Sequence, residues 1–281
     1  MKTLTKIKFA KFVFYLIKLF GIKQQRISKR NSINWCLDLS EAIDLSIFLT
    51  GSFQGDIVKS IIKLIIKKKF YNQKINIIDI GSNIGDKSLS LCQNLINQKI
   101  NNFKIYSIEP TEYAFQKQTQ NLNLNPILKK KIQLSKFYVL NDKKKINKVY
   151  ASWKLNTVSN DHKIHQGIFK NINKNTKNIS LDKFIDKNKI KKLIILKIDT
   201  DGFEMEILKS CIKYIKKHNV IIFMEYAPYL IKEQGSNEKD FYNFVNKNGF
   251  FIYDLKFNPI SSIRVGKGST TEILLIKNKL T

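Results

Sequence analysis

The strongest constraint on the fold is a repeated alternation of short apolar runs with segments of helical spacing. Runs rich in Ile, Val and Leu occupy residues 75–80, 104–109, 132–140, 193–198 and 220–224. Apolar residues with helical spacing follow at residues 87–98, 113–124, 205–217 and 238–247. Near-continuous β-branched runs are typical of strands buried on both faces of a parallel sheet. With two last runs at 250–255 and 272–276, the pattern predicts a doubly wound, mostly parallel seven-stranded α/β sheet.

The segment before the first of these strands predicts a helical extension. In residues 55–69, Ile57, Ile61 and Ile65 share one side and lysines recur every fourth residue on the other. Residues 6–20 also fit an amphipathic helix. Their longest apolar run, residues 12–17, is too short to span a bilayer, and no small-residue cleavage site follows it. This helix either packs on the domain or anchors at a membrane interface with snorkelling lysines.

These patterns divide the chain into two parts. Residues 1–70 hold the amphipathic helix and a lead-in segment, and residues 71–281 form a Rossmann-like domain. The domain carries an excursion over residues 141–190, whose portion 141–178 is rich in Lys and Asn. The total of 281 residues suits one large α/β domain.

The net charge of +28 raises the question of an anionic partner. Arginine occurs only at positions 26, 30 and 264, whereas nucleic-acid surfaces favour arginine for its bidentate fork. We therefore expect mostly solvated surface lysines, with a membrane surface as the second interpretation and nucleic acid as the third. The sequence leaves the oligomeric state open.

The cysteines point to a reducing compartment. Cys36, Cys92 and Cys211 lie far apart, without zinc-ligand spacing, and their odd number argues against a disulfide framework. We expect a cytoplasmic protein, with peripheral contact at the inner membrane surface through residues 6–20 as an alternative.

A glycine-rich turn follows the run at residues 75–80. It holds Asp79, Gly81, Ser82, Asn83 and Gly85. A dinucleotide fingerprint that starts at Gly81 needs glycine at positions 83 and 86, which are Asn and Asp here. A carboxylate at a helix N-terminus repels a pyrophosphate but not a cationic sulfonium. The turn therefore favours S-adenosylmethionine over NAD as the cofactor.

Two further strand ends supply candidate cofactor ligands. Glu109 ends the second run, where an acid can accept hydrogen bonds from both ribose hydroxyls. Asn141 and Asp142 follow the third run, where they either read an adenine amine or form a polar turn.

Charged residues at the fourth run are the candidates for catalysis. Lys197 and Asp199 share one sheet face, and a lysine in an apolar strand needs a partner; Glu225 is the candidate partner if the two strands are neighbours. The alternatives are a salt bridge that braces the sheet and a group that orients the substrate. A divalent metal held by Asp199, Asp201, Glu204 and Glu225 is a minor alternative, so we predict no metal.

Several motifs occur together in one order. They read Ile-Asp-Ile-Gly-Ser-Asn-Ile-Gly at 78–85, Ile-Glu-Pro-Thr at 108–111, Asn-Leu-Asn-Leu-Asn at 121–125, Ser-Leu-Asp at 180–182 and Lys-Ile-Asp-Thr-Asp-Gly-Phe-Glu at 197–204. This order resembles the FkbM family of class I methyltransferases, which depend on S-adenosylmethionine. The resemblance covers about residues 74–230, with a lead-in at 35–55. Asp201, where the family usually has Glu, and Gln54, in place of a frequent acid, depart from it.

The resemblance implies both an activity and site residues. Asp79, Gly81, Asn83 and Gly85 would line the cofactor turn, Glu109 would bind the ribose, and residues 199–204 would face the reaction centre. Members of the family are mostly O-methyltransferases that act on sugars or natural-product hydroxyls.

We therefore expect an enzyme that methylates a hydroxyl of a sugar, glycan or natural product. Removing the hydroxyl proton needs a base. Asp199 is the first candidate for this base, and Lys197 and Glu204 are the other catalytic candidates beside it. His162 and His165 are secondary candidates for the base. The alternatives are an RNA-modifying methyltransferase and a non-catalytic relative that only binds the cofactor.

Overall fold

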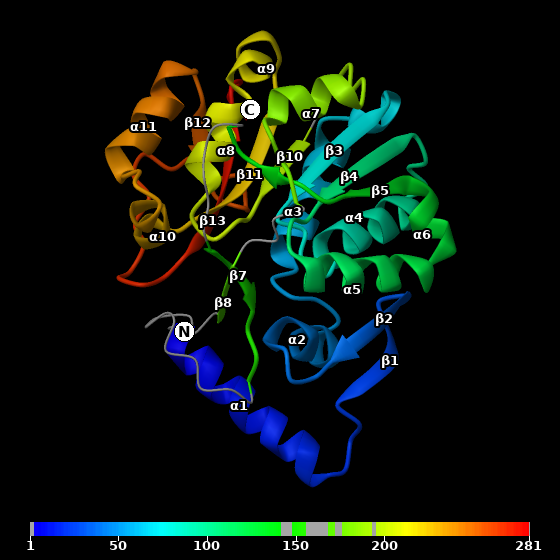
Figure 1. The fold of residues 1–281 in the computed structure, drawn as a ribbon. Coiled ribbons are helices and arrows are strands. Elements are labelled where there is room, and N and C mark those ends of the chain that lie inside the picture. Colours follow the sequence, from blue (N-terminus) through cyan, green and yellow to red (C-terminus); the bar gives the residue numbers. More distant parts are fainter. Residues whose placement is uncertain (1–2, 142–147, 156–167, 172–175, 193–194, 281) are drawn as a thin grey trace.

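A computed structural model describes residues 3–141, 148–155, 168–171, 176–192 and 195–280. Its centre is a seven-stranded sheet with the order β12-β13-β11-β10-β3-β4-β5 (Figure 1). The strands are β3 (Ile75–Ile80), β4 (Phe103–Ile108), β5 (Ile132–Ser135), β10 (Ile195–Ile198), β11 (Ile221–Tyr226), β12 (Phe251–Tyr253) and β13 (Thr271–Ile276). The pairs from β11 to β5 are parallel, and β13 runs antiparallel to both of its neighbours. The predicted α/β class and seven-stranded sheet are confirmed.

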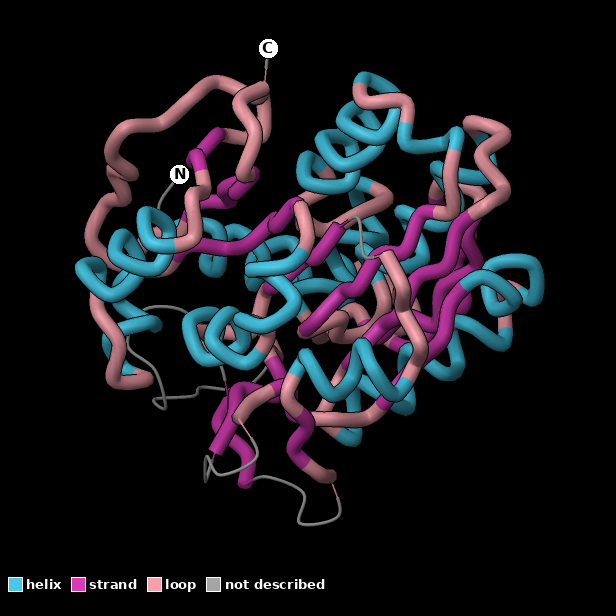
Figure 2. The backbone as a smooth tube through the Cα atoms, turned by 90° about the horizontal axis from the view of Figure 1, so that it is seen from above, coloured by secondary structure: helices cyan, strands magenta, loops and turns pink. Residues whose placement is uncertain are grey.

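Helices cover both faces of the sheet (Figure 2). One face packs against α3 (Asp56–Lys67), α4 (Asp86–Asn97), α5 (Glu112–Asn123) and α6 (Pro126–Lys131). The other packs against α7 (Leu181–Lys187), α8 (Glu204–Ser210), α9 (Ile212–Lys217), α10 (Pro228–Glu233) and α11 (Glu238–Lys247). Neighbouring residues of one strand serve different cores, because side chains alternate along a strand. Ile77 lies in the first core and Ile78 in the second.

The N-terminal part packs on the first of these faces. Helix α1 (Thr3–Leu19) leads into a hairpin of β1 (Gln25–Arg30) and β2 (Ile33–Asp38), followed by α2 (Ala42–Thr50). The predicted helical extension omitted this hairpin, whose first strand is charged and mostly exposed. Hydrogen bonds hold β2 to the end of α5, because Asn121 accepts from the Cys36 amide at 2.8 Å and Asn125 from the Asn34 amide at 2.9 Å.

Two predicted elements are interrupted. The strand predicted at 132–140 is wrong beyond Ser135, because β6 (Tyr138–Val139) leaves the main sheet and pairs with β9 (Asn178–Ile179). The helix predicted at 205–217 breaks at Cys211, where the backbone leaves helical angles. There the Ser210 hydroxyl donates to the Ile207 carbonyl and accepts from the Leu181 amide.

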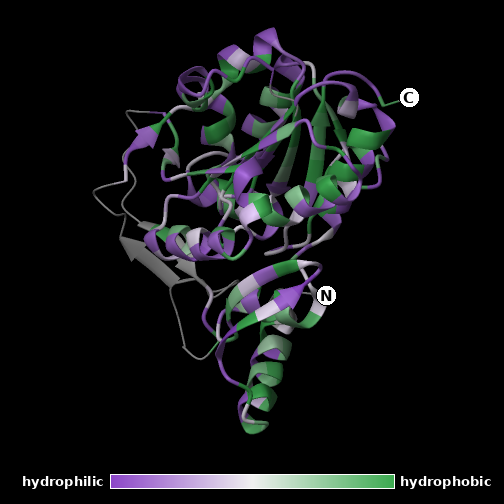
Figure 3. Ribbon diagram, turned by 90° about the vertical axis from the view of Figure 1, so that its right-hand side faces the viewer, coloured by the Kyte–Doolittle hydropathy of each residue, from purple (hydrophilic) through white to green (hydrophobic). Residues whose placement is uncertain are grey.

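The excursion is described only in part. Its described part includes a hairpin of β7 (Lys148–Ser152) and β8 (Ile168–Asn171), labelled in Figure 1. Residues just after β7 attach to the N-terminal part, since the Leu155 amide donates to the Ser40 carbonyl at 2.7 Å. Figure 3 shows α1 at the far end of the molecule from the main sheet. No helix among the described residues is both long enough and apolar enough to cross a bilayer.

Candidate functional site

The turn after β3 brings two strands into close approach. Gly81 has a φ of +74°, and a Cβ on it would lie 1.8 Å from the backbone oxygen of Asp199. Gly85 has a φ of +91°, and a Cβ there would lie 2.6 Å from Leu89 and 2.9 Å from Gln118. Both glycines are therefore required by the protein's own packing, before any ligand is considered.

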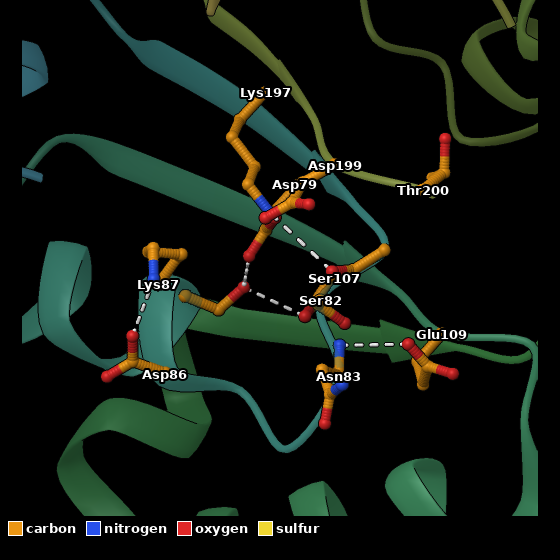
Figure 4. Close-up of polar contacts among 12 residues, drawn as sticks. Asp79, Ser82, Asn83, Asp86, Lys87, Ser107, Glu109, Lys197, Asp199 and Thr200 are labelled. Carbon is orange, nitrogen blue, oxygen red and sulfur yellow. Dashed lines mark hydrogen bonds and ion pairs between the residues drawn. The ribbon is translucent and has the colours of Figure 1, made fainter. Parts of the chain in front are cut away.

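A buried polar network lies beneath this turn (Figure 4). Asp79 is fully buried, and its carboxylate accepts a hydrogen bond from Ser88 at 2.6 Å. Ser88 contacts Ser107 at 2.8 Å, and Gln118 joins Ser107 to Ser82. Asp79 and Ser82 are absent from the lining of the cavity described below, so the network supports the turn from behind.

Lys197 is buried at the centre of the sheet, where it pairs with two carboxylates. Its Nζ lies 3.1 Å from Asp79 and 3.4 Å from Asp199. Burial alone would lower the pKa of Lys197, but the charges of Asp79 and Asp199 outweigh burial and raise it. Our expectation that Glu225 is its partner was wrong.

The strand register explains the correction. Lys197 lies directly beside Asp79 of β3, whereas its neighbour on β11 is Phe223, two residues before Glu225.

Glu109 lies at the end of β4 and is 5% exposed. One carboxylate oxygen accepts from the Thr111 amide at 2.9 Å and the Thr111 hydroxyl at 2.6 Å, and the other accepts from the Asn83 amide at 2.8 Å. Burial raises the pKa of Glu109 more than these hydrogen bonds lower it. A carboxylate has about four acceptor positions, so about one remains for a ligand.

The loop after β10 is organised by Glu204. This buried side chain accepts hydrogen bonds from the Thr200 amide at 2.9 Å, the Thr200 hydroxyl at 3.0 Å and the Gly202 amide at 3.2 Å. Asp201, in the same loop, has a φ of +51°, and burial and the charge of Asp199 raise its pKa well above the usual range. Glu204 thus holds the loop from behind while Asp199 and Asp201 face the open side.

A cavity opens at the carboxyl ends of β3, β4 and β10, as expected for a parallel sheet. It is lined by Ile80, Gly81, Asn83, Glu109, Pro110, Thr111, Phe137, Tyr138, Val139, Leu140, Val149, Trp153, Asp199, Thr200, Asp201, Phe203 and Ile207. The charged residues in this lining are Glu109, Asp199 and Asp201, with no Lys or Arg among them. The described lining therefore suits a ligand with positive charge and repels a pyrophosphate.

Sequence reasoning missed the apolar wall of this cavity. Residues 137–140 and Phe203 form most of it, and Trp153 adds a half-buried aromatic ring. Trp153 packs with Ala227, Leu230 and Tyr229, and its amide donates to Glu41 at 3.0 Å. The Tyr138-Val-Leu run marked a strand, but its place in the wall depends on the chain leaving the sheet after β5.

Further carboxylates gather beside the cavity. Glu225 of β11 lies opposite Glu272 of β13, and it follows Met224, whose partner Ile198 is the last residue of β10, directly before Asp199. Burial and the charge of Asp199 raise the pKa of both glutamates, that of Glu272 to about 7. Within the part of the chain that the structure describes, no group of His, Cys, Asp or Glu residues is arranged to hold a metal ion.

Asp86, used above to argue against a pyrophosphate, is absent from the cavity lining. Its carboxylate lies 2.7 Å from the Lys87 ammonium and accepts from the Phe53 amide at 3.3 Å. Asp86 does lie in the first turn of α4, but Lys87 compensates its charge, so Asp86 contributes little to the repulsion of a pyrophosphate. The acidic lining of the cavity provides the electrostatic argument instead.

The remaining predicted site residues are not part of the described cavity lining. Asn141 is exposed and is absent from the cavity lining. Asp142, His162 and His165 lie outside the described residues.

Several known proteins are similar to this chain. A crystal structure of methyltransferase FkbM from Methylobacillus flagellatus KT is 16% identical, covers 72% of this chain and 43% of its own, and has a TM-score of 0.42. The chain thus spans under half the length of that protein. Magnesium protoporphyrin IX methyltransferase from Synechocystis PCC 6803, with bound SAH, is 11% identical with a TM-score of 0.42 (80% and 87% covered). An O-methyltransferase from Bacillus cereus, in complex with SAH, is 10% identical with a TM-score of 0.44 (83% and 95% covered).

None of the curated proteins matches the sequence. A family model described as the methyltransferase FkbM domain matches residues 79–252. That match spans more than half of the chain and includes the turn after β3, Glu109 and the loop after β10. The chain belongs to the FkbM methyltransferase domain family.

Proposed function

We propose that the protein transfers a methyl group from S-adenosylmethionine to a hydroxyl of a sugar, glycan or natural product. The observation that carries the proposal is the cavity at the carboxyl edge of the sheet, whose charged lining residues are all carboxylates. Family membership supplies the reaction class, and the cavity supplies the residues.

The residues of the cavity fit the cofactor. S-adenosylmethionine supplies, when bound, a methyl group on a positively charged sulfur. Glu109 keeps about one acceptor position for a ribose hydroxyl beyond its three hydrogen bonds to Thr111 and Asn83. Residues 137–140 provide an apolar wall for a purine ring. Asp199 and Asp201 supply carboxyl oxygens for the ammonium and sulfonium groups of the cofactor.

Two carboxylates are placed to accept the proton that the acceptor hydroxyl loses. Asp199 lines the cavity with a side chain that is 29% exposed, while Lys197 holds its other side. Asp201 lines the same cavity and has a raised pKa, which makes it a stronger base once it is ionised. We assign Asp199 as the base because the Lys197 ammonium, 3.4 Å away, fixes its orientation toward the cavity, with Asp201 as the competing assignment.

The surroundings of the reaction centre favour a neutral acceptor. The described lining of the cavity holds no Lys or Arg, so it offers no cation to pair with the phosphates of a polyanion such as RNA. Carboxylates accept hydrogen bonds from sugar hydroxyls, and the Trp153 ring offers an apolar face to a sugar. The positive charge of the chain as a whole therefore does not make RNA the acceptor.

Cofactor binding is the first test. Calorimetry on the full-length protein is expected to show binding of S-adenosylhomocysteine, the demethylated product, and no binding of NAD. Tighter binding of NAD would contradict the proposal.

Methyl transfer is then measured with radiolabelled cofactor on a panel of glycans and natural-product hydroxyl compounds, with total RNA in parallel. Label in the hydroxyl acceptors supports the proposal. Label in RNA alone assigns the RNA-modifying alternative, and cofactor binding without transfer to any acceptor assigns the non-catalytic one.

A further inference from the structure

Helix α1 carries large apolar side chains on two opposite sides. Phe14 and Ile17 are 4% and 6% exposed and belong to the core that reaches the main sheet. On the other side are Phe9, Phe12, Tyr15 and Leu19, which we call the outer face, with exposures of 61%, 57%, 62% and 66%. Their spacing of three or four residues places them along one side of the helix.

The outer face has no cover from the described part of the chain. Phe20, directly after the helix, is 75% exposed and extends the apolar surface. Figure 3 shows the helix at one end of the molecule, with apolar residues along its visible length. Large contiguous apolar surfaces on a folded protein mark a binding site.

The charge around this surface is of one sign. Residues 1–37 contain nine Lys or Arg residues and no Asp or Glu, although the whole chain has 22 acidic residues. Lys8 and Lys18 are exposed on α1, and Lys23 and Lys29 are exposed just after it. Aromatic rings bordered by lysines match the requirements of a helix that lies in the headgroup region of an anionic membrane.

We propose that the outer face of α1 docks the protein on the surface of an anionic lipid bilayer. The phenyl and leucyl groups enter the headgroup boundary while the flanking lysines reach the lipid phosphates, as snorkelling side chains do. A second copy of the chain fits less well, because a symmetric contact through this face would bring two sets of like charges together. Single-stranded nucleic acid is usually held in a basic groove, whereas α1 presents a convex helix.

The structure also decides which variants can test this proposal. Deleting residues 6–20 would remove Phe14 and Ile17 from the core, so a loss of binding could reflect misfolding. Substitution of the exposed Phe9 and Phe12 avoids this problem. Glutamine keeps the helix propensity and removes the apolar surface.

The experiment is flotation of the full-length protein with two kinds of vesicle. One contains phosphatidylcholine alone, and the other also contains about 30% phosphatidylserine, which makes its surface anionic. We expect binding to the anionic vesicles, weaker binding to the neutral ones, and release by salt. The affinity of the variant F9Q/F12Q for the anionic vesicles should be lower than that of the wild type by a factor of about ten or more. Its matched control is I66Q/I127Q, since Ile66 and Ile127 are exposed helical residues (43% and 70%) outside α1, and that control should bind like the wild type.

Charge is tested in the same assay. K8Q/K18Q should weaken anionic binding several-fold, and K74Q/K191Q, which neutralises exposed lysines elsewhere, should not. Circular dichroism and S-adenosylhomocysteine binding confirm that each variant is folded. Wild-type-like binding by F9Q/F12Q would overturn the proposal. Absence of vesicle binding would also overturn it, and a dimer or an RNA complex lost in F9Q/F12Q would then identify the occupant.

Discussion

Glu109 and Asp199 are both carboxylates at strand ends, but the structure surrounds them differently. Glu109 is buried and held by three hydrogen bonds from Asn83 and Thr111. Asp199 is part-exposed to the cavity and held by Lys197. The first arrangement suits constant binding of a cofactor, and the second suits a group that accepts a proton during the reaction.

Substitutions should separate these two residues. Glu109→Gln keeps the shape and weakens a charged hydrogen bond, so the Kd for S-adenosylhomocysteine should rise about tenfold or more. Asp199→Asn should leave that Kd within a few-fold and lower kcat by about 10²–10⁴. Calorimetry and a methyl-transfer assay measure the two effects.

The matched control for Asp199 is Asp201→Asn. Asparagine tolerates the positive φ at position 201, so packing damage is small. An unchanged kcat in D199N together with a large loss in D201N would move the base to Asp201.

Glu272 gives the site a pH-dependent stability. Burial and the charge of Asp199 raise its pKa from 4.5 to about 7. The folded state therefore favours the protonated form of Glu272. The contribution of this protonation to the free energy of unfolding is complete below about pH 4.5, falls as the pH rises toward 7, and is absent above that value.

Glu272→Gln removes this ionisation cost. The variant should unfold at a higher temperature than the wild type at pH 8, by on the order of 2 kcal/mol or several degrees, and the difference should vanish near pH 4.5. Thermal unfolding measured by circular dichroism across this pH range checks the sign. Glu238→Gln, at an exposed glutamate, is the control and should show no such pH trend. A lower unfolding temperature for E272Q at pH 8 would contradict the assignment.

Among the elements, the ones that sequence patterns predicted with correct bounds are those whose ends are marked by local sequence. Strand β3 and helix α11 have the predicted bounds, because an unbroken run of buried residues or a complete capping box marks their ends. The β1–β2 hairpin escaped prediction because its first strand buries only Ser28 and is otherwise charged or exposed.

The site residues divide into those that local motifs mark and those whose place depends on the tertiary structure. The turn after β3 and Glu109 were found because local motifs mark them. The partner of Lys197 depends on the order β11-β10-β3 and its register, which one sequence does not reveal. The wall formed by residues 137–140 and Trp153 likewise depends on where the excursion packs.

Hydrogen bonds join the excursion to the lead-in segment beside the cavity. Glu41 is 6% exposed and accepts the Trp153 amide, and the Ala42 amide donates back to the Trp153 carbonyl at 3.2 Å. Glu41 thereby positions an aromatic wall of the cavity from a distant part of the sequence. This contact links the N-terminal part to the wall of the cavity.

Glu41→Ala should loosen that wall without affecting the cofactor. We expect a red-shifted, more readily quenched Trp153 emission and an acceptor KM about tenfold higher, with kcat and the cofactor Kd nearly unchanged. The chain has two tryptophans, and the other, Trp35, is fully buried, so W153F provides the background emission. Glu41→Gln retains an acceptor oxygen and should restore most of the wild-type behaviour. Unchanged Trp153 emission in E41A would remove the positioning role.

At the scale of the whole molecule, charge is distributed unevenly. The net charge is +28, yet the edge that carries the cavity gathers Glu109, Asp199, Asp201, Glu225 and Glu272. The excess of lysine elsewhere makes the compact state repel itself, because like charges are closer in the folded chain than in the unfolded one. Lys104 shows this locally, since burial first and then the charges of Lys74 and Lys131 lower its pKa.

Salt should therefore stabilise this protein. Raising NaCl from about 0.02 M to about 0.3 M shortens the Debye length to below 10 Å, which screens the surface repulsion and should raise Tm by a few degrees.

The variant K74E/K191E changes two exposed loop lysines and lowers the net charge by four, from +28 to +24. It should have a higher Tm than the wild type at low salt and gain less from added NaCl. The buried pairs Asp44–Lys117 and Asp79–Lys197 are shielded from salt and contribute little to this trend. A Tm that falls with NaCl would show that attractive surface pairs outweigh the repulsion, and calorimetry at both salt concentrations distinguishes the two signs.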